Sequence, residues 1–265
     1  MDAGITAKLV RFQQPEKVLP HLPGLDESRI AALFGLTPSD YRALREEFAT
    51  RTREAAAGLL ADPALAGDVG RLPFAPGQRI AVLGESTTAD RLSWCEILRH
   101  LLPDGTGLAN LAVSGCTTTQ ALTTQLPALS SQRPDWVLCM LGGNDAQRLG
   151  PDGGTRLVSQ DETARNLRTL FDLSATDGAP RWLWLTPTGV DEARVRAYPY
   201  FRKARITWTN RDIDRIAAFL ADRPEPTVDT REPAAGRHMD DGVHLTLDGQ
   251  RSVAAAVVRA LARRA

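Results

Sequence analysis

The sequence predicts an α/β fold built on a parallel β-sheet, and two observations carry this prediction. From Arg79 onward, short apolar runs rich in β-branched residues alternate with amphipathic segments of helical period, a pattern typical of a parallel sheet covered by helices. Several of these runs end at glycine next to a hydroxyl or amide side chain. Because open α/β proteins bind ligands beyond the carboxyl ends of their strands, such residues are placed for chemistry.

Composition narrows the class of protein. The chain of 265 residues has a formal net charge of zero, so charge gives no reason to expect a nucleic acid or an anionic membrane surface as partner. The first residues carry no basic segment followed by an apolar one, and no apolar run is long enough to cross a bilayer. Three cysteines at irregular spacing fit neither a zinc site nor a disulfide framework. We therefore expect a cytoplasmic protein; the sequence does not specify its oligomeric state, and a monomer is compatible with it.

Residues 1–78 are predicted to form an N-terminal arm and a helical extension. Residues 1 to about 25 contain several prolines without a clear period, and we expect them to be irregular. A short helix is expected over Glu27–Phe34, followed by a longer one with Thr37 as its N-cap and Pro38 in its first position. The apolar stripe of that longer helix consists of Tyr41, Leu44, Phe48, Ala55 and Leu59. Proline and glycine between Gly67 and Gln78 mark the link to the next part.

Residues 79–265 are predicted to form the main domain. Strands are expected at Arg79–Leu83, Leu108–Val113, Trp136–Leu141, Trp182–Leu185 and Thr227–Asp229. Helices are expected at Asp90–Leu102, Thr117–Leu126, Glu162–Leu173 and Asn210–Asp222, with a last helix that Thr246 caps. The second of these helices is expected to stop before Pro127.

Three successive strand ends carry glycine with a hydroxyl or amide group. The segments are Gly84-Glu85-Ser86, Ser114-Gly115-Cys116 and Gly142-Gly143-Asn144-Asp145. Glycine allows the backbone to approach a ligand closely, so that N–H groups can point at a bound oxygen. Each glycine alone fits an ordinary turn and Ser86 alone fits a helix N-cap, but the three segments together indicate a site at one sheet edge.

A carboxylate and an imidazole lie close together before the last helix. Asp241 precedes His244 by three residues, a spacing that allows the carboxylate to accept the imidazole N–H and to orient the other ring nitrogen as a base. The remaining histidines, His21, His100 and His238, lack such a setting and are expected to be structural.

These four segments, in this order and spacing, resemble the SGNH hydrolases, also called GDSL esterases and lipases. The resemblance runs from about Arg79 to the C-terminus and does not include the N-terminal extension. It implies a flavodoxin-like three-layer sandwich with a five-stranded parallel sheet. It also implies a small-molecule ester substrate and no metal or cofactor.

The resemblance further implies a role for each motif residue. Ser86 would be the nucleophile, His244 the general base and later the acid, and Asp241 the carboxylate that orients it. The oxyanion hole would consist of the backbone N–H groups of Ser86 and Gly115 and the side-chain amide of Asn144. A serine hydroxyl needs such a base, and a developing oxyanion needs such donors.

Four neighbouring residues need a separate interpretation. Glu85 stands where the family commonly has aspartate, and we treat it as a tolerated variant. Cys116 lacks a partnered histidine and is expected to be a core residue. Asp145 is expected to brace its loop or cap the next segment. Asp240 competes with Asp241 as the partner of His244, and only the spacing seen in the family favours Asp241.

The leading hypothesis is a serine esterase that works through an acyl-enzyme, and the same residues would serve an acyltransferase if an alcohol took the acyl group. A nucleotide-binding domain is disfavoured because the turn at Gly84 has neither G-x-G-x-x-G nor the P-loop lysine. A nucleophile elbow is disfavoured because Thr88 stands where G-x-S-x-G needs its second glycine. A catalytically silent binding module would require loops that misplace the motif residues.

Substrate contacts are predicted from the loops after the third and fourth strands, Ala146–Gln160 and Val190–Trp208. The candidate side chains in these loops are Arg148, Arg194, Tyr198 and Tyr200. The N-terminal helices are expected either to cover part of the cleft or to pack behind the sheet.

Overall fold

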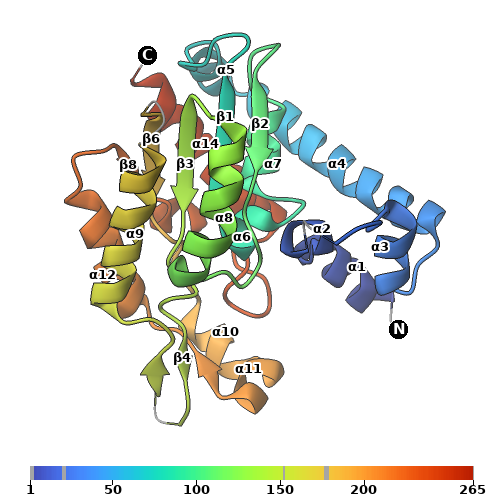
Figure 1. Ribbon diagram of the computed structural model, residues 1–265, viewed down its shortest axis with the longest axis vertical. Coiled ribbons are helices and arrows are strands. Elements are labelled where there is room, and N and C mark those ends of the chain that lie inside the picture. The colour runs from blue at the N-terminus through green and yellow to red at the C-terminus, as the bar shows by residue number, and fades with distance from the viewer. Residues whose placement is uncertain (1–2, 20–21, 152, 176–178, 265) are drawn as a thin grey trace.

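The computed structural model describes residues 3–19, 22–151, 153–175 and 179–264. At its centre is a five-stranded parallel sheet with the order β2-β1-β3-β6-β8 (Figure 1). The strands are β2 Gly107–Asn110, β1 Arg79–Gly84, β3 Trp136–Met140, β6 Arg181–Leu185 and β8 Thr227–Val228. The predicted α/β class and the five parallel strands are therefore confirmed.

Helices follow these strands along the chain. They are α6 Ser86–Ala89, α7 Trp94–Arg99, α8 Thr118–Gln132, α9 Gln160–Ser174, α12 Asn210–Ala221, α13 Arg231–Ala234 and α14 Leu247–Ala262. Two short helices, α10 Glu192–Ala197 and α11 Pro199–Ala204, lie near the carboxyl edge of the sheet, shown at the bottom of Figure 1. A small antiparallel sheet beside them was not predicted; its strands are β4 Arg148–Leu149, β5 Thr155–Arg156 and β7 Ile206–Thr207.

The central strands β1, β3 and β6 are buried on both faces, which explains why they are apolar over most of their length. Ile80 and Val82 of β1 face a core that includes side chains of α7 and α14. Ala81 and Leu83 alternate with them and face a second core that includes side chains of α8, α9 and α12. Figure 1 shows α8 and α9 in front of the sheet. The result is the three-layer arrangement that the resemblance implied.

The first 78 residues form more helix than predicted. Their helices are α1 Ala3–Phe12, α2 Pro15–Val18, α3 Glu27–Leu33, α4 Pro38–Leu60 and α5 Pro63–Val69. The expectation of an irregular arm was wrong for α1 and α2, since Pro15 takes the first position of α2, where its missing N–H costs no hydrogen bond. The N-cap role of Thr37 is confirmed, because its side chain accepts from the Asp40 N–H.

These helices pack on the main domain. Ala55, Ala56 and Leu59 of α4 belong to the core beneath α14, and Val10 of α1 shares a smaller core with Leu92. The division between residues 78 and 79 stays a prediction. Among the described residues, no helix has the length and hydropathy that a membrane-spanning segment needs.

Two helices of the main domain, α7 and α8, differ most from their predicted ranges. The helix expected to stop before Pro127 continues through it as α8 to Gln132, because its apolar side chains, among them Ala121 and Leu129, pack into the core under the sheet. The helix expected from Asp90 begins instead at Trp94, where the Ser93 side chain caps it by accepting from the Glu96 N–H.

Candidate active site

Ser86 lies at the carboxyl end of β1 and opens helix α6. The turn before it is tight, since a Cβ on Gly84 would approach the side chain of Thr88 to 2.6 Å. The first N–H groups of a helix have no intrahelical acceptor, which leaves the backbone N–H of Ser86 available to a ligand. The serine side chain is half-buried and lines a cavity.

His244 reaches Ser86 from the other end of the chain. Its Nε2 lies 3.0 Å from the Ser86 Oγ, and its Nδ1 lies 2.9 Å from the Asp241 Oδ2. The other carboxylate oxygen of Asp241 accepts the backbone N–H groups of Val243 and His244 at 3.0 and 2.9 Å. Of the two adjacent aspartates, Asp241 is therefore the one beside the imidazole, whereas Asp240 is exposed.

The environment of Asp241 favours its charged form. Burial alone would raise the pKa of this carboxyl, but the hydrogen bonds and positive charge offered by His244, together with backbone N–H donors, hold the pKa well below its usual range. The carboxylate is thus anionic wherever the protein is folded near neutral pH, as an orienting partner for an imidazole must be.

Gly115 and Asn144 lie on the neighbouring loops. Gly115 has a φ of +78°, and a Cβ there would meet nothing within 4 Å, because the residue faces the open cavity. Asn144 also lines the cavity, and its Nδ2 donates to the carbonyl of Cys116 at 3.1 Å. The predicted oxyanion donors therefore lie around the same cavity as Ser86.

Glu85 explains how the Asn144 loop is held. Its two carboxylate oxygens accept the backbone N–H groups of Gly143 and Asn144 at 3.0 and 2.9 Å. Burial raises the pKa of Glu85 to about 8, although these two donors favour the carboxylate. Gly143 has no room for a side chain, since a Cβ would stand 2.3 Å from the Glu85 Oε1. The residue that the sequence left unexplained joins the Ser86 turn to the Asn144 loop.

Asp145 and Cys116 both have structural surroundings. Asp145 is buried and accepts from the Thr118 N–H at 2.9 Å, at the start of α8, and from the Thr163 hydroxyl at 3.0 Å. Burial raises the pKa of the Cys116 thiol to about 11, so little thiolate is present at neutral pH. Both observations agree with the roles expected from the sequence.

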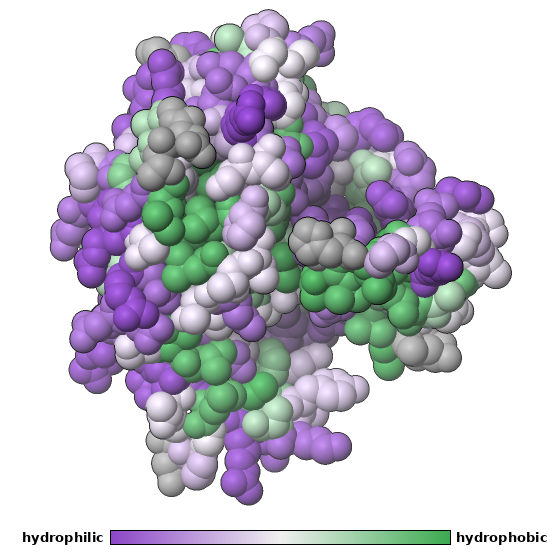
Figure 2. All heavy atoms as spheres, in the orientation of Figure 1, coloured by the Kyte–Doolittle hydropathy of each residue, from purple (hydrophilic) through white to green (hydrophobic). Residues whose placement is uncertain are grey.

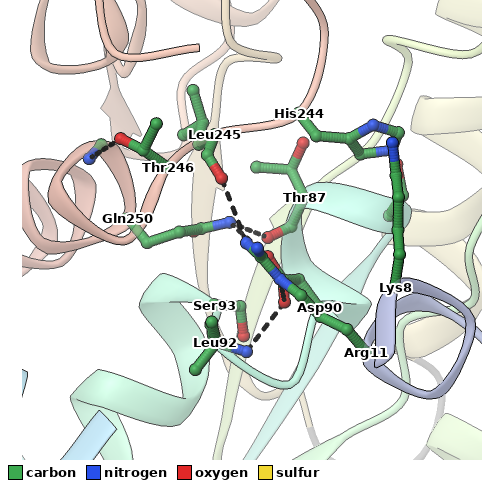
Figure 3. Close-up of polar contacts among 12 residues, drawn as sticks. Lys8, Arg11, Thr87, Asp90, Leu92, Ser93, His244, Leu245, Thr246 and Gln250 are labelled. Atoms are coloured by element: carbon green, nitrogen blue, oxygen red, sulfur yellow. Dashed lines mark hydrogen bonds and ion pairs between the residues drawn. The ribbon is translucent and has the colours of Figure 1, made fainter. Parts of the chain in front are cut away.

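The N-terminal helix α1 borders the site, which the sequence reasoning missed. The Lys8 Nζ lies 3.2 Å from the Asp241 Oδ2 and 3.3 Å from the Tyr198 hydroxyl. The ring of Phe12 lies 4.5 Å, centroid to centroid, from the ring of His244. Figure 3 shows Lys8 extending from α1 past His244. The signal was present as the helical spacing of Ile5, Leu9 and Phe12, but the prolines that follow concealed it.

Arg11 attaches α1 to the main domain. Its guanidinium meets the buried Asp90 carboxylate in two hydrogen bonds of 2.7 and 2.5 Å and donates to the Leu245 carbonyl at 3.1 Å (Figure 3). The Ser114 hydroxyl donates to the Phe12 carbonyl. These hydrogen bonds join α1 to Asp90, Ser114 and Leu245, which lie in three distant parts of the chain.

The predicted substrate contacts divide into two groups. Tyr198 and Tyr200 line the cavity that contains Ser86. Arg148 does not, because its guanidinium binds the buried Asp212 carboxylate at 2.6 and 3.2 Å. Arg194 donates instead to the His238 carbonyl at 2.7 Å. The loop arginines are thus occupied by the protein itself.

His100 and His238 contact residues other than Ser86 and Asp241. The His238 Nε2 lies 2.7 Å from the Gly189 carbonyl, and the His100 Nε2 lies 3.2 Å from the Thr52 hydroxyl. His21 lies outside the described residues. In the part of the chain that the structure describes, no three His, Cys, Asp or Glu side chains form a group that could hold a metal ion.

Comparison with known proteins identifies the family. The model of the GDSL-like lipase/acylhydrolase family matches residues 82–252. Thioesterase 1/protease 1/lysophospholipase L1 of Escherichia coli (strain K12) is 34% identical over 113 residues, 40% of this chain and 50% of that protein. The chain thus spans about half the length of the curated relative it matches.

Solved structures show the same fold at low identity. A lipase/acylhydrolase from Enterococcus faecalis superposes with a TM-score of 0.55 at 20% identity, over 71% of this chain and 96% of that one. An acetylxylan esterase from Geobacillus stearothermophilus gives a TM-score of 0.52 at 18% identity, over 71% and 95% of the two chains. Because the family model matches more than half of its residues, the chain belongs to the GDSL-like lipase/acylhydrolase family.

Proposed function

We propose that the protein hydrolyses a small-molecule carboxylic ester with Ser86 as nucleophile. One observation carries the proposal: a continuous polar chain from the Ser86 Oγ through His244 to the buried Asp241 carboxylate, with separations of 3.0 and 2.9 Å. A hydroxyl within hydrogen-bond reach of an oriented imidazole is the requirement for nucleophilic catalysis by serine.

The first half of the reaction forms an acyl-enzyme. The Ser86 Oγ attacks the ester carbonyl carbon while the His244 Nε2 takes the hydroxyl proton, which gives a tetrahedral intermediate with a negative oxygen. Asp241 accepts the Nδ1–H and stabilises the imidazolium. When the intermediate collapses, the C–O bond to the alcohol breaks and the imidazolium gives its proton to the departing oxygen.

The second half repeats the sequence with water. The imidazole removes a proton from water, the resulting hydroxide attacks the acyl carbon, and the released Ser86 oxygen recovers the proton from the imidazolium. In both halves the negative oxygen would receive hydrogen bonds from the Ser86 and Gly115 backbone N–H groups and from the Asn144 side-chain amide. For Asn144 this means exchanging its bond to the Cys116 carbonyl for one to the substrate.

The names of the relatives support an ester-cleaving activity, since one is a thioesterase and lysophospholipase and another is an acetylxylan esterase. The test measures hydrolysis of nitrophenyl esters by the wild type, by Ser86→Ala and by Ser130→Ala, whose serine is exposed on α8. We expect Ser86→Ala to lose at least about 10³-fold in kcat/KM and Ser130→Ala to keep wild-type rates. Undiminished hydrolysis by a folded Ser86→Ala protein would refute the proposal.

The same measurement separates hydrolysis from acyl transfer. If an alcohol instead of water attacks the acyl-enzyme, the product is a new ester and not a free acid. Product analysis with added straight-chain alcohols should give the free acid as the main product. A new ester as the main product at low alcohol concentration would reassign the protein as an acyltransferase that uses the same residues.

A further inference from the structure

The cavity at Ser86 has two apolar walls from distant parts of the chain. Its volume is about 520 Å³, within the range of about 300–1,000 Å³ that small-molecule sites occupy. One wall is the face of α1 that carries Ile5, Leu9 and Phe12. A second wall carries Phe201 and Trp208, together with Tyr198. Polar groups lie at the end of the cavity near Ser86.

The second wall is a packed aromatic cluster. The ring centroids of Tyr198 and Phe201 are 4.9 Å apart, and those of Phe201 and Trp208 are 5.1 Å apart. The Trp208 indole N–H donates to the Gly143 carbonyl at 3.0 Å, next to the Asn144 loop. This hydrogen bond holds the aromatic cluster in a fixed position relative to the Asn144 loop, which carries a proposed oxyanion donor.

The wall from α1 is equally well fixed. Arg11 binds Asp90, Lys8 binds Asp241 and Tyr198, and the backbone carbonyl of Arg11 accepts the Arg91 N–H at 3.1 Å. Because the Lys8 ammonium binds Asp241 and Tyr198, its charge is paired even though the residue lines an apolar cavity. Figure 2 shows hydrophobic residues at the surface where α1 and α2 lie. Ile5, 51% exposed, stands at the rim of the cavity.

This wall lies outside the segment that matches the family model, which begins at residue 82. Residues 5–12 are therefore not part of the matched segment, although several of them line the cavity at Ser86. Phe12 places this wall directly against the His244 ring.

We propose that α1 is a specificity element that binds the acyl chain of the substrate, and that the substrate is an ester of a straight-chain acyl group longer than acetyl. The proposal rests on the esterase function proposed above. The acyl chain lies between Ile5 and Leu9 on one side and the aromatic cluster on the other. Apolar walls favour hydrocarbon over water, so each methylene placed between them strengthens binding.

The first experiment compares acyl lengths. Nitrophenyl acetate, butanoate, hexanoate and octanoate are hydrolysed by the wild type and by Ile5→Asp and Leu9→Asp, with Leu33→Asp as the matched control. Leu33 is 61% exposed on α3 and does not line the cavity. We expect the wild-type kcat/KM to rise about tenfold from butanoate to hexanoate. The α1 variants should lose most of that rise, whereas the control keeps it.

A second series varies the alcohol. Acetates of ethanol, butanol, hexanol and octanol should be hydrolysed at similar rates by the wild type, and the control Leu33→Asp should leave these rates unchanged. A chain-length gain in this series, and not in the acyl series, would overturn the assignment of the cavity to the acyl chain. Equal acyl profiles in the α1 variants and the control would overturn the role of α1, while ester hydrolysis itself would still stand.

A binding measurement covers the case in which no ester is hydrolysed. In the Ser86→Ala protein, isothermal titration calorimetry should show that octanamide binds at least about tenfold more tightly than butanamide. Introducing Ile5→Asp should remove this difference. Equal affinities for the two amides would refute the acyl-binding role of α1 independently of the catalytic proposal.

Discussion

The ammonium of Lys8 lies 3.2 Å from the Oδ2 of Asp241, the same oxygen that lies 2.9 Å from the Nδ1 of His244. A residue of the N-terminal helix thus shares the carboxylate with the proposed catalytic base. Burial alone would lower the pKa of Lys8, but the negative charge of Asp241 and the hydroxyl of Tyr198 raise it, so the lysine stays charged. Lys8 thus adds a positive charge beside the carboxylate that orients His244.

We predict that Lys8→Met moves the acidic limb of the kcat/KM profile to higher pH by about half a unit, because the positive charge beside the Asp241 carboxylate is lost. The shift is small since the Lys8 side chain is 41% exposed and solvent screens its charge. The measurement is a pH–rate profile of ester hydrolysis. Lys8→Arg, which keeps the charge, should retain the wild-type profile, and a Lys8→Met profile identical to it would contradict the electrostatic role.

Replacing Asn144 by alanine should lower kcat by about 10²–10³-fold with little change in KM, as expected for a donor that acts mainly on the developing oxyanion. The readout is steady-state hydrolysis of a nitrophenyl ester, with the melting temperature as a check on folding. A large rise in KM at unchanged kcat would show that Asn144 binds the ground state instead.

We predict that the free energy of unfolding depends on pH through the side chain of Glu85. Its pKa is about 8 in the folded protein, against 4.5 for an unperturbed glutamate. Between these values the folded state binds a proton that the unfolded chain releases, so this group lowers the free energy of unfolding as pH rises, by at most about 1.4 kcal/mol per pH unit. Between about pH 5 and 8, the free energy of unfolding should therefore fall less steeply with rising pH for Glu85→Gln than for the wild type. Urea unfolding at each pH measures this free energy.

The exposed Glu54 provides the control, since Glu54→Gln should leave the slope unchanged. Glu85→Gln should also lower kcat by about tenfold, because one amide group cannot accept from both the Gly143 and Asn144 N–H groups and the Asn144 loop shifts. Parallel stability slopes for wild type and Glu85→Gln would contradict the assignment of the proton to this residue.

Removing the arginine that attaches α1 should destabilise the protein strongly. In Arg11→Met the fully buried Asp90 carboxylate loses its charged partner, which costs about 3–5 kcal/mol. Arg42→Met breaks an exposed pair with Glu27 and should cost less than about 1 kcal/mol. Urea unfolding measures both. The double variant Arg11→Met with Asp90→Asn should recover part of the loss, and equal costs for Arg11→Met and Arg42→Met would contradict the account.

The sequence was sufficient for the parallel sheet and for the residues gathered at its carboxyl edge. The central strands β1, β3 and β6 are apolar after their first residues because both faces are buried, and Gly84, Gly115 and Gly142 mark the turns where the chain leaves the sheet. Asp241 and His244 are three residues apart, so a local pattern sufficed to pair them. Ser86 and His244 are far apart in the sequence, and the fold brings them within hydrogen-bond distance. From the sequence, only the family resemblance indicated that these two residues belong to one site.

The contribution of α1 was not predictable in the same way. Its contacts reach Asp90 and Asp241, far along the chain, and no local pattern encodes such pairings. Arg148 was suggested as a substrate contact because it follows a strand, yet it pairs with the buried Asp212 of α12. The strands β4 and β7 of the small antiparallel sheet have two residues each and lie within loops that show no apolar run of their own.

Covalent labelling tests the central claim most directly. The protein would be treated with an alkyl fluorophosphonate, which phosphonylates an activated serine with loss of fluoride, and digested for mass spectrometry. We predict a single adduct on Ser86, absent from His244→Ala, with ester hydrolysis lost in proportion to labelling. An adduct on Cys116, or full hydrolytic activity in a protein labelled completely at Ser86, would contradict the proposed mechanism.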